Sequence, residues 1–227
     1  MTPLTRTAGL PDSHAVPTTA TTCDWGAVVP VKRLAVAKSR LSVYGDPVRA
    51  ELALAFACDV VTACLLCEAV ARVVVVTDDP RATVVLQGLG ARVVPDARGG
   101  GLNPALSRGA EVVRAVLPGC NVVAVTADLP SLRPDELGAA LAAAPIGGRA
   151  FVADSDGIGT TLLTAAAGVA LDPAFGPGSR VRHLGSGAVE LSAGQALRQD
   201  VDTPDDLGSA LLLGVGRHTA RALAYLV

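Results

Sequence analysis

The chain has 227 residues, of which 50% are hydrophobic and 18% charged, a composition that supports a sizeable core and argues against intrinsic disorder. Its 19 basic and 21 acidic residues give a net charge of -2, which leaves no overall field to attract nucleic acid or an anionic membrane. The apolar stretches are interrupted well before the roughly 20 residues that a membrane-spanning helix needs. We therefore expect one domain with neither nucleic-acid nor membrane partners, in which any anion is bound by a local site.

The N-terminal segment lacks the charged start and the apolar run of a signal peptide. We expect residues 1–23 to form a mobile tail and residues 24–227 to form a single domain. Five irregularly spaced cysteines without an export signal favour reduced thiols in a cytoplasmic protein. Cys64 and Cys67 have the CxxC spacing of redox and metal motifs, but their apolar flanks favour buried structural thiols.

From residue 24 onward, short Val-rich runs alternate with longer Ala- and Leu-rich runs, as is typical of parallel strands joined by helices. The expected strands are 25–31, 72–77, 91–94, 121–126, 149–153 and 188–191. The expected helices are 47–69, 80–89, 103–117, 134–144 and 204–215, with a last short helix at 217–226 on the surface. These elements predict a three-layer α/β fold with a mostly parallel central sheet.

In open parallel sheets, ligands bind beyond the carboxyl ends of the strands, so the segments that follow the strands are the candidate site. The segment after the first strand carries four cations in nine positions without an adjacent acid: Lys32, Arg33, Lys38 and Arg40. We interpret this segment as a loop that binds a polyphosphate. The alternative is a solvated basic loop.

The segment after the third strand, residues 98–103, has three consecutive glycines ahead of a helix. Such a segment lets the backbone approach a ligand closely, although a flexible turn has the same composition. The motifs GxGxxG after the first strand, GxxxxGK[ST] and GxSxG are missing. Their absence argues against a dinucleotide oxidoreductase, a Walker-type nucleotide hydrolase and a serine hydrolase.

Two acidic segments suggest a metal site. Asp128 follows the fourth strand in TADLP, and Asp200 and Asp202 alternate along DVDTP, where we expect only one of the two to face the crevice. A helix cap ahead of Pro204 is the alternative role for Asp202 or for Thr203. Together the segments predict a divalent cation whose shell is completed by phosphate oxygens and water.

Two further segments, 154–161 and 175–183, combine glycines with hydroxyl side chains and, in the second, with cations. We expect loops whose backbone N–H groups and Ser179 bind a carboxylate or phosphate, although structural turns remain the alternative. Asp154 and Asp156 are either further metal contacts or turn formers, and the Asp-Gly pair favours a turn for Asp156. His183 is expected to have a packing or hydrogen-bonding role.

Between residues 25 and 210 the chain carries, in order, VPVK, AKSRL, GLN, TADLP, DxxGxGTT, FGxGSxxxH and DVDTPxDL. This ordered set resembles the guanylyltransferases of coenzyme F-420 biosynthesis, which are similar in fold to molybdenum-cofactor and sugar nucleotidyltransferases. The resemblance implies a Rossmann-like, GT-A-like nucleotidyltransferase domain. It also implies transfer of GMP from GTP to phosphoenolpyruvate or 2-phospho-L-lactate, release of pyrophosphate, and dependence on Mg²⁺.

Because that reaction brings several negative charges together, cations must neutralise them. We expect Lys32, Lys38 and Arg40 to hold the triphosphate, and Asp128 and Asp202 to hold Mg²⁺. The resemblance assigns the other substrate contacts as follows: the small phospho-acid to the backbone of Thr161 and Gly176 and the hydroxyl of Ser179, and the nucleotide to Lys32, Gly101 and Asn103.

Two other functions compete with this one. A nucleotidyltransferase that uses CTP or a sugar phosphate is disfavoured by the pairing of FGxGS with VPVK, and a non-catalytic nucleotide-sensing module is disfavoured by the retained lysines and carboxylates. The composition, rich in Ala, Val and Arg, resembles an actinobacterial protein, which favours phosphoenolpyruvate as the acceptor. The oligomeric state stays open between a monomer and a homo-oligomer.

Overall fold

The computed structural model describes residues 25–96 and 100–225 of the chain. The tail expected at 1–23, and Arg98 and Gly99 of the expected glycine loop, lie outside the described residues. The strands are β1 (Trp25–Pro30), β2 (Val70–Val76), β3 (Arg92–Val94), β4 (Asn121–Val125), β5 (Arg149–Ala153), β6 (Thr160–Ala165) and β7 (Val189–Glu190). The helices are α1 (Asp46–Leu66), α2 (Pro80–Gly88), α3 (Leu102–Val116), α4 (Pro134–Ala142), α5 (Ser179–Gly185), α6 (Gln195–Arg198), α7 (Pro204–Leu213) and α8 (Arg217–Ala224), with a 3-10 helix η1 (Ser39–Tyr44).

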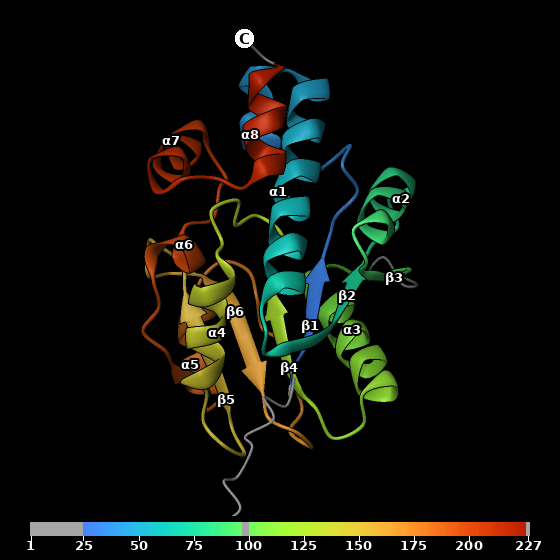
Figure 1. Cartoon of the computed structure of the whole chain (residues 1–227). Helices are drawn as coiled ribbons and strands as arrows, with labels where there is room; N and C mark the ends of the chain where they lie inside the picture. Colours follow the sequence, from blue (N-terminus) through green and yellow to red (C-terminus); the bar gives the residue numbers. More distant parts are fainter. Residues whose placement is uncertain (1–24, 97–99, 226–227) are drawn as a thin grey trace, which may run out of the picture.

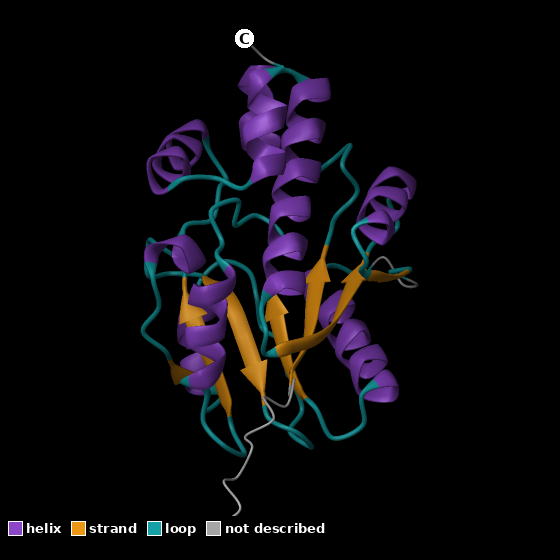
Figure 2. Ribbon diagram, viewed as in Figure 1, coloured by secondary structure: helices purple, strands orange, loops and turns teal. Residues whose placement is uncertain are grey.

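The described strands form one seven-stranded sheet in the order β3-β2-β1-β4-β6-β5-β7. Strand β6 is antiparallel to both of its neighbours, and its arrow runs against those of β1 and β4 in Figure 2. Helices cover both faces of the sheet, with α1, α2 and α4 on one face and α3 on the other (Figure 1). The expected three-layer α/β fold with a mostly parallel sheet is confirmed.

The prediction of a loop over residues 154–161 is wrong at its end, because Thr160 begins β6. All six residues of β6 are buried, since the strand lies between β4 and β5 and is covered on both faces. Such a strand lacks the polar alternation that marks a half-exposed strand in a sequence. The glycines that precede β6 therefore led to the prediction of a loop that includes its first residues.

Close packing of α3 on β1 fixes one side of the sheet. A Cβ atom on Gly109 of α3 would lie 2.2 Å from a methyl of Val28, and one on Gly26 of β1 would lie 2.1 Å from a methyl of Val113. Both glycines thus allow a helix–strand approach that any larger residue would prevent. The N-terminus of α3 is held in a fixed position relative to β1 as a result.

A separate hydrophobic cluster beyond the carboxyl edge of the sheet joins the segment after β1 to the segment before α7. Its buried members are Leu41, Leu52, Phe56, Val201, Leu207 and Ala210. Leu41 comes from η1 and Val201 from the second acidic segment, so the basic and acidic segments share one core. This packing positions their charged side chains relative to one another.

Helix α8 lies alongside α1, at the top of Figure 1. The buried carboxylate of Asp59, in α1, accepts hydrogen bonds from the backbone N–H groups of His218 (3.0 Å) and Thr219 (2.9 Å). A carboxylate at this place satisfies the first N–H groups of α8 and complements the helix dipole. The last expected helix is therefore confirmed, and its start is fixed by a residue far away in the sequence.

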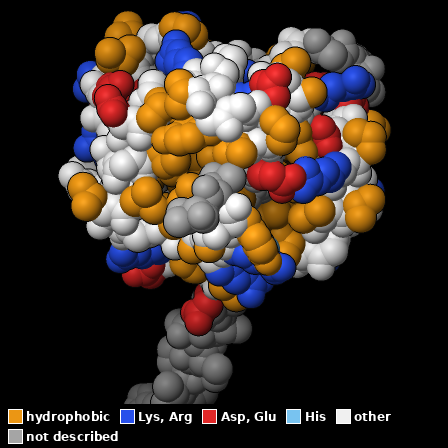
Figure 3. Space-filling view, turned by 90° about the horizontal axis from the view of Figure 1, so that it is seen from above, with side chains coloured by type: hydrophobic (Ala, Val, Ile, Leu, Met, Phe, Trp, Pro, Cys, Tyr) orange, Lys and Arg blue, Asp and Glu red, His pale blue; other side chains and the backbone are white. Residues whose placement is uncertain are grey.

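Among the described helices, none is both long and apolar enough to cross a membrane. Cys58, Cys64, Cys67 and Cys120 are all buried, as expected for structural thiols. Burial, with a smaller contribution from Cys67, raises the pKa of Cys64 to about 12. On the face seen in Figure 3, acidic and basic side chains are interspersed.

Candidate active site

A pocket of about 810 Å³ lies beyond the carboxyl ends of β1 and β4. Its walls come from segments far apart in the sequence: 30–40, 126–128, 154–160, 175–179 and 200–206. The sequence analysis singled out each of these segments separately, and the structure brings them together at the edge of the sheet where ligands bind in such folds. This pocket is the candidate active site.

Lys38 lies at the centre of the charged residues of the pocket. Its Nζ donates to Oδ2 of Asp128 at 2.6 Å and to Oδ1 of Asp202 at 2.7 Å. Burial would lower the pKa of Lys38, but the two carboxylates outweigh it and raise the pKa above its ordinary value. Burial would likewise raise the pKa of Asp128, but the charge and hydrogen bond of Lys38 lower it. Lys38 and Asp128 are therefore both charged at neutral pH.

The other expected cations differ in their placement. Lys32 is exposed and lines the pocket. Arg40 also lines it, with Nη1 3.7 Å from Asp202 and 72% of its side chain exposed, which leaves it available to a ligand. Arg33 is not among the residues that line the pocket. The structure thus brings Lys32, Lys38 and Arg40 of the basic segment to the pocket.

Two buried residues that the sequence pattern did not single out hold this basic loop in place. The guanidinium of Arg49, in α1, donates to the carbonyl oxygens of Leu34 (3.1 Å), Ala35 (2.7 Å) and Ala37. The carboxylate of Asp79 accepts from the N–H of Leu34 at 2.9 Å and also caps α2. For the contacts of Arg49, the only signal in the sequence was a lone arginine at the start of an apolar helix. Neither contact can be inferred without knowing where the loop folds back.

The expectation that only one of Asp200 and Asp202 faces the crevice is wrong, since both line the pocket. Residues two apart point to the same side of an extended segment, and it is Val201 between them that points into the core. The N–H of Val201 donates to the carbonyl of Asp128 at 3.0 Å, which ties the two acidic segments together. Burial, followed by the charges of Asp128 and Asp202, raises the pKa of Asp200 to about 7.

The alternative role as a helix cap falls to Thr203. Its hydroxyl accepts from the N–H of Asp206 at 3.3 Å, and Asp206 in turn accepts from the N–H of Thr203 at 2.7 Å, which makes a capping box for α7. Asp202 is therefore not needed as the cap. Its carboxylate is directed to Lys38 instead.

The residues present fit a divalent cation in part. Oδ1 of Asp128 is buried without a hydrogen-bond partner, and a carboxylate oxygen of this kind suits a cation. No cluster of three or more His, Cys, Asp or Glu side chains suited to a metal occurs among residues 25–96 and 100–225. Asp154 is engaged in its own turn, since its oxygens accept from the N–H groups of Ile158 (2.9 Å) and Gly159 (2.7 Å). Two protein carboxylates thus need phosphate oxygens and water to complete a cation shell.

The opposite wall of the pocket combines hydroxyls and glycine backbone with the aspartates Asp154 and Asp156. Gly176 (φ 119°) and Ser179 line it, as does Thr160. The neighbouring Thr161 is directed inward, where its hydroxyl donates to the carbonyl of Leu197 at 2.7 Å and its own carbonyl accepts from the N–H of Thr126. Of the expected acceptor residues, the structure therefore brings Gly176 and Ser179 to the pocket and adds Thr160.

The expected nucleotide contacts are only partly at the pocket. Among its lining residues are Lys32 and Leu102, but not Gly101 or Asn103. The side-chain amide of Asn103 accepts from the N–H of Phe175 at 2.8 Å and donates to its carbonyl at 3.1 Å. Asn103 thus fastens the start of α3 to the segment that carries Gly176. With one bond of each kind made to Phe175, the amide keeps one N–H and one oxygen lone pair for a further partner.

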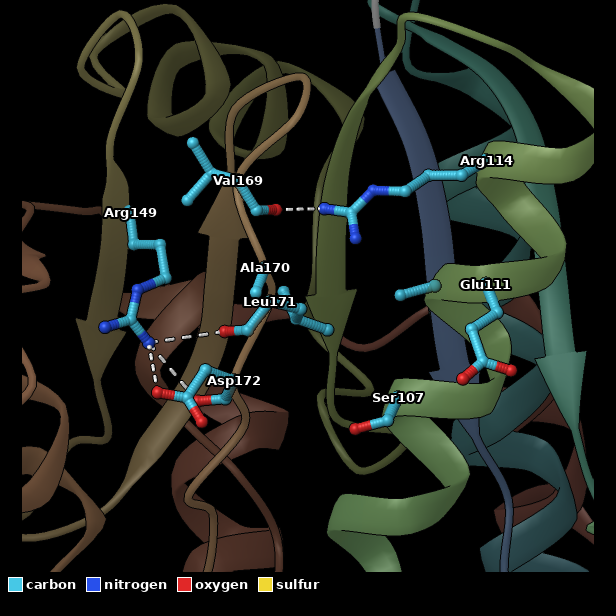
Figure 4. Close-up of a pocket in the computed structure, with 9 residues that line it drawn as sticks. Ser107, Glu111, Arg114, Arg149, Val169, Ala170, Leu171 and Asp172 are labelled. Carbon is cyan, nitrogen blue, oxygen red and sulfur yellow. Dashed lines mark hydrogen bonds and ion pairs between the residues drawn. The ribbon is translucent and has the colours of Figure 1, made fainter.

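A second pocket, of about 540 Å³, lies between α3 and residues 169–172 (Figure 4). Its two arginines are already paired: Arg114 donates to the carbonyl of Val169, and Arg149 contacts Asp172 at 3.2 Å. Figure 4 shows these side chains turned toward the backbone of the 169–172 segment. The pocket also holds the acidic residues Glu111 and Asp172, but both of its arginines are already engaged with the 169–172 segment.

Comparison with solved structures gives the fold family. The fold is similar to that of a nucleotide-diphospho-sugar transferase from Desulfovibrio desulfuricans G20, with a TM-score of 0.64, 16% identity, and coverage of 89% of this chain and 96% of that chain. It is also similar to a Mycobacterium tuberculosis H37Rv protein solved as a complex with manganese, with a TM-score of 0.50, 20% identity, and coverage of 83% and 97%. The fold is that of the nucleotidyltransferases.

Comparison of sequences gives the family. Residues 25–226 match the family described as guanylyl transferase CofC like. The chain is 60% identical over 206 residues to the phosphoenolpyruvate guanylyltransferase of Streptomyces coelicolor, with coverage of 89% of this chain and 97% of that protein. The chain belongs to the CofC-like guanylyl transferase family, and the resemblance carried by its ordered motifs is confirmed.

Proposed function

We propose that this protein is a guanylyltransferase that transfers GMP from GTP to phosphoenolpyruvate, or to 2-phospho-L-lactate, and releases pyrophosphate in coenzyme F-420 biosynthesis. The observation that carries the proposal is the position of Lys38 between Asp128 and Asp202, in a pocket whose opposite wall offers hydroxyls and glycine backbone. One wall suits a triphosphate with a cation, and the other suits a small anion. The name of the Streptomyces coelicolor relative supports the same reaction.

In this function Lys32, Lys38 and Arg40 bind the triphosphate of GTP. The ammonium of Lys38 must leave Asp128 and Asp202 when these carboxylates bind a divalent cation, and the incoming phosphates give it a new partner. We assign that cation as Mg²⁺; the unpartnered Oδ1 of Asp128 and the manganese complex of a protein with the same fold support a divalent ion. When bound, the cation would neutralise charge on the α-phosphate and on the leaving pyrophosphate.

We assign the acceptor to the hydroxyl wall, with the backbone of Gly176 and the side chain of Ser179 as its contacts. An oxygen of its phosphate attacks the α-phosphorus of GTP, a P–O bond forms, and the bond to the β-phosphate oxygen breaks. The acceptor phosphate is ionised near pH 7, so no side chain has to remove a proton. The protein therefore acts by positioning and by charge neutralisation.

The test is a pyrophosphate-release assay with purified protein, Mg²⁺ and GTP, in which phosphoenolpyruvate, 2-phospho-L-lactate and 3-phosphoglycerate are offered separately. The best acceptor is then assayed with ATP and CTP. Release that requires both GTP and one phospho-acid is expected. Release with CTP in place of GTP would support a different nucleotidyltransferase, and binding of GTP without any release would support a sensing module.

A further inference from the structure

His183, in α5, is a fully buried residue that the mechanism above does not use. Its Nε2 accepts a hydrogen bond from the N–H of Ala174 at 3.0 Å, and its Nδ1 lies 3.0 Å from Oγ1 of Thr160. The rings of Phe151 and Phe175 pack against it at centroid distances of 5.7 and 5.3 Å. The imidazole therefore has one fixed orientation and two defined partners.

The partner of Nε2 determines where the ring proton is. A backbone N–H can only donate, so Nε2 must be the unprotonated nitrogen. Burial, followed by the charges of Arg149 and Arg182, lowers the pKa of His183 to about 4, so the ring is neutral near pH 7. Its one N–H proton is then on Nδ1 and is donated to the hydroxyl oxygen of Thr160.

The direction of that bond affects the acceptor wall through a chain of hydroxyls. Oγ of Ser179 donates to Oγ1 of Thr160 at 3.0 Å, and both residues line the pocket. The two hydroxyls carry two protons, and one of them is used in the bond that joins them, whichever way that bond runs. Because His183 donates to this pair, it consumes neither proton, and one remains for a ligand. In the other tautomer Nδ1 would accept from Thr160, Ser179 would donate to Thr160, and no proton would remain.

We propose that His183 is a positioning residue that, by donating to Thr160, leaves one hydroxyl proton of the Thr160–Ser179 pair to be donated to the anionic group of the acceptor. The inference rests on the proposed function, which places the phospho-acid against Ser179. A donor held in this way favours an anionic phosphate or carboxylate over a neutral group. It also explains why a histidine is buried beside a pocket without reaching the reacting atoms.

The tautomer is tested directly by long-range ¹H–¹⁵N spectra of protein labelled with ¹⁵N-histidine. His183 is assigned by comparison with the His183→Asn and His218→Asn variants. The expected result is a protonated Nδ1 and an unprotonated Nε2, with an Nδ1 proton that shifts when phosphoenolpyruvate is added in the presence of Mg²⁺ and a non-hydrolysable GTP analogue. Protonation of Nε2, or an Nδ1 proton unchanged at saturating acceptor, would overturn the proposal.

Kinetics provide the second test. His183→Leu is expected to raise the KM for the acceptor about tenfold, as the loss of one charge-assisted hydrogen bond would, with the KM for GTP changed less than about twofold. His183→Asn has an N–H near the position of Nδ1 and is expected to recover part of this loss. His218→Asn, on α8, is the control and should match the wild type. Equal effects of His183→Leu on both substrates would overturn the positioning role.

The two proposals fail in different ways. If no phospho-acid supports pyrophosphate release while the spectra show the Nδ1 proton, the proposed function is wrong and the hydrogen-bond chain stands as structure only. If turnover is normal and the ring carries its proton on Nε2, the proposed function stands and the positioning role is wrong. The spectra of the wild type decide the tautomer even if His183→Leu does not fold.

Discussion

Lys38 has a left-handed backbone conformation, with φ 53° and ψ 46°, which is unfavourable for a residue that carries a side chain. This conformation directs its ammonium between Asp128 and Asp202, where two short ion pairs outweigh the cost. The contacts of Arg49 and Asp79 with the preceding residues keep the loop in that shape. The charge balance at the centre of the pocket thus depends on a few individual residues.

Asp128→Asn removes one negative charge from this arrangement at nearly unchanged volume. It is expected to reduce kcat about a hundredfold or more, because the variant loses an electrostatic contribution to the transition state. Pyrophosphate release measures the effect, and circular dichroism should show the same fold. Asp135→Asn, an exposed change in α4, is the control. Near-normal turnover of Asp128→Asn would rule out its assigned role.

The raised pKa of Asp200 predicts how the free energy of unfolding of the metal-free protein depends on pH. Its pKa is raised to about 7 by burial and by its acidic neighbours, above the ordinary value of 3.8. Between these two pH values the folded state binds more protons than the unfolded state, so this group lowers the free energy of unfolding as the pH rises from about 4 to about 7. The Asp200→Asn variant lacks this ionisable group, so it should not lose this part of its stability as the pH rises.

The difference in the free energy of unfolding between Asp200→Asn and the wild type should therefore increase by about 2 kcal/mol between pH 5 and pH 8. One pKa unit corresponds to about 1.4 kcal/mol, and the contact of Asp200 with solvent reduces the full effect. Urea denaturation of both proteins in EDTA at the two pH values measures this. A difference that does not change with pH would show that the carboxyl of Asp200 ionises normally.

At the scale of elements, the docking of α8 on α1 depends on a glycine. A Cβ atom on Gly216, just before α8, would lie 2.3 Å from the carboxyl carbon of Asp59. Gly216→Ala should therefore displace the carboxylate that binds the first N–H groups of α8, and lower the free energy of unfolding by about 1–3 kcal/mol. Gly208→Ala in α7 is the matched control, because nothing lies within 4 Å of its added Cβ. Equal stability of the two variants in urea denaturation would contradict the docking role of Asp59.

The elements that sequence alone predicts are those with a strong local pattern. The helix expected at 47–69 is observed as α1, ending at Leu66, and the strand expected at 149–153 is β5. Strand β6 was missed because its first residues, Thr160 and Thr161, continue a glycine- and hydroxyl-rich run that is typical of a loop, and α6 because four residues carry no periodicity. The antiparallel position of β6 follows from its pairing with the preceding strand β5 and with the more distant β4, and the second pairing leaves no local pattern in the sequence.

At the scale of the whole molecule, the sequence predicted which segments form the site better than it predicted the contacts between their side chains. Each polar segment after a strand was identified because the carboxyl ends of parallel strands meet at one edge. The pairing of Lys38 with both carboxylates, the engagement of Asn103 with Phe175 and the contact of His183 with Thr160 join residues at least 23 positions apart. Such contacts depend on the fold, so motif order alone does not determine them.

The thiol of Cys64 reports on the stability of the whole molecule. It is fully buried on the α1 face of the sheet, and its pKa of about 12 leaves very little thiolate at pH 8. Alkylation of Cys64 should therefore require global unfolding. Ligands that bind only the folded state then slow it by a factor of 1 + [L]/Kd.

With GTP and Mg²⁺ at about ten times the dissociation constant, labelling of Cys64 in mild urea should slow about tenfold. Tandem mass spectrometry follows this residue separately from the other cysteines, and Asp128→Asn, which weakens the cation site, should show a smaller effect. If GTP binds but the labelling rate does not change, Cys64 becomes reactive through a local opening of α1, and the site and this core do not unfold as one unit.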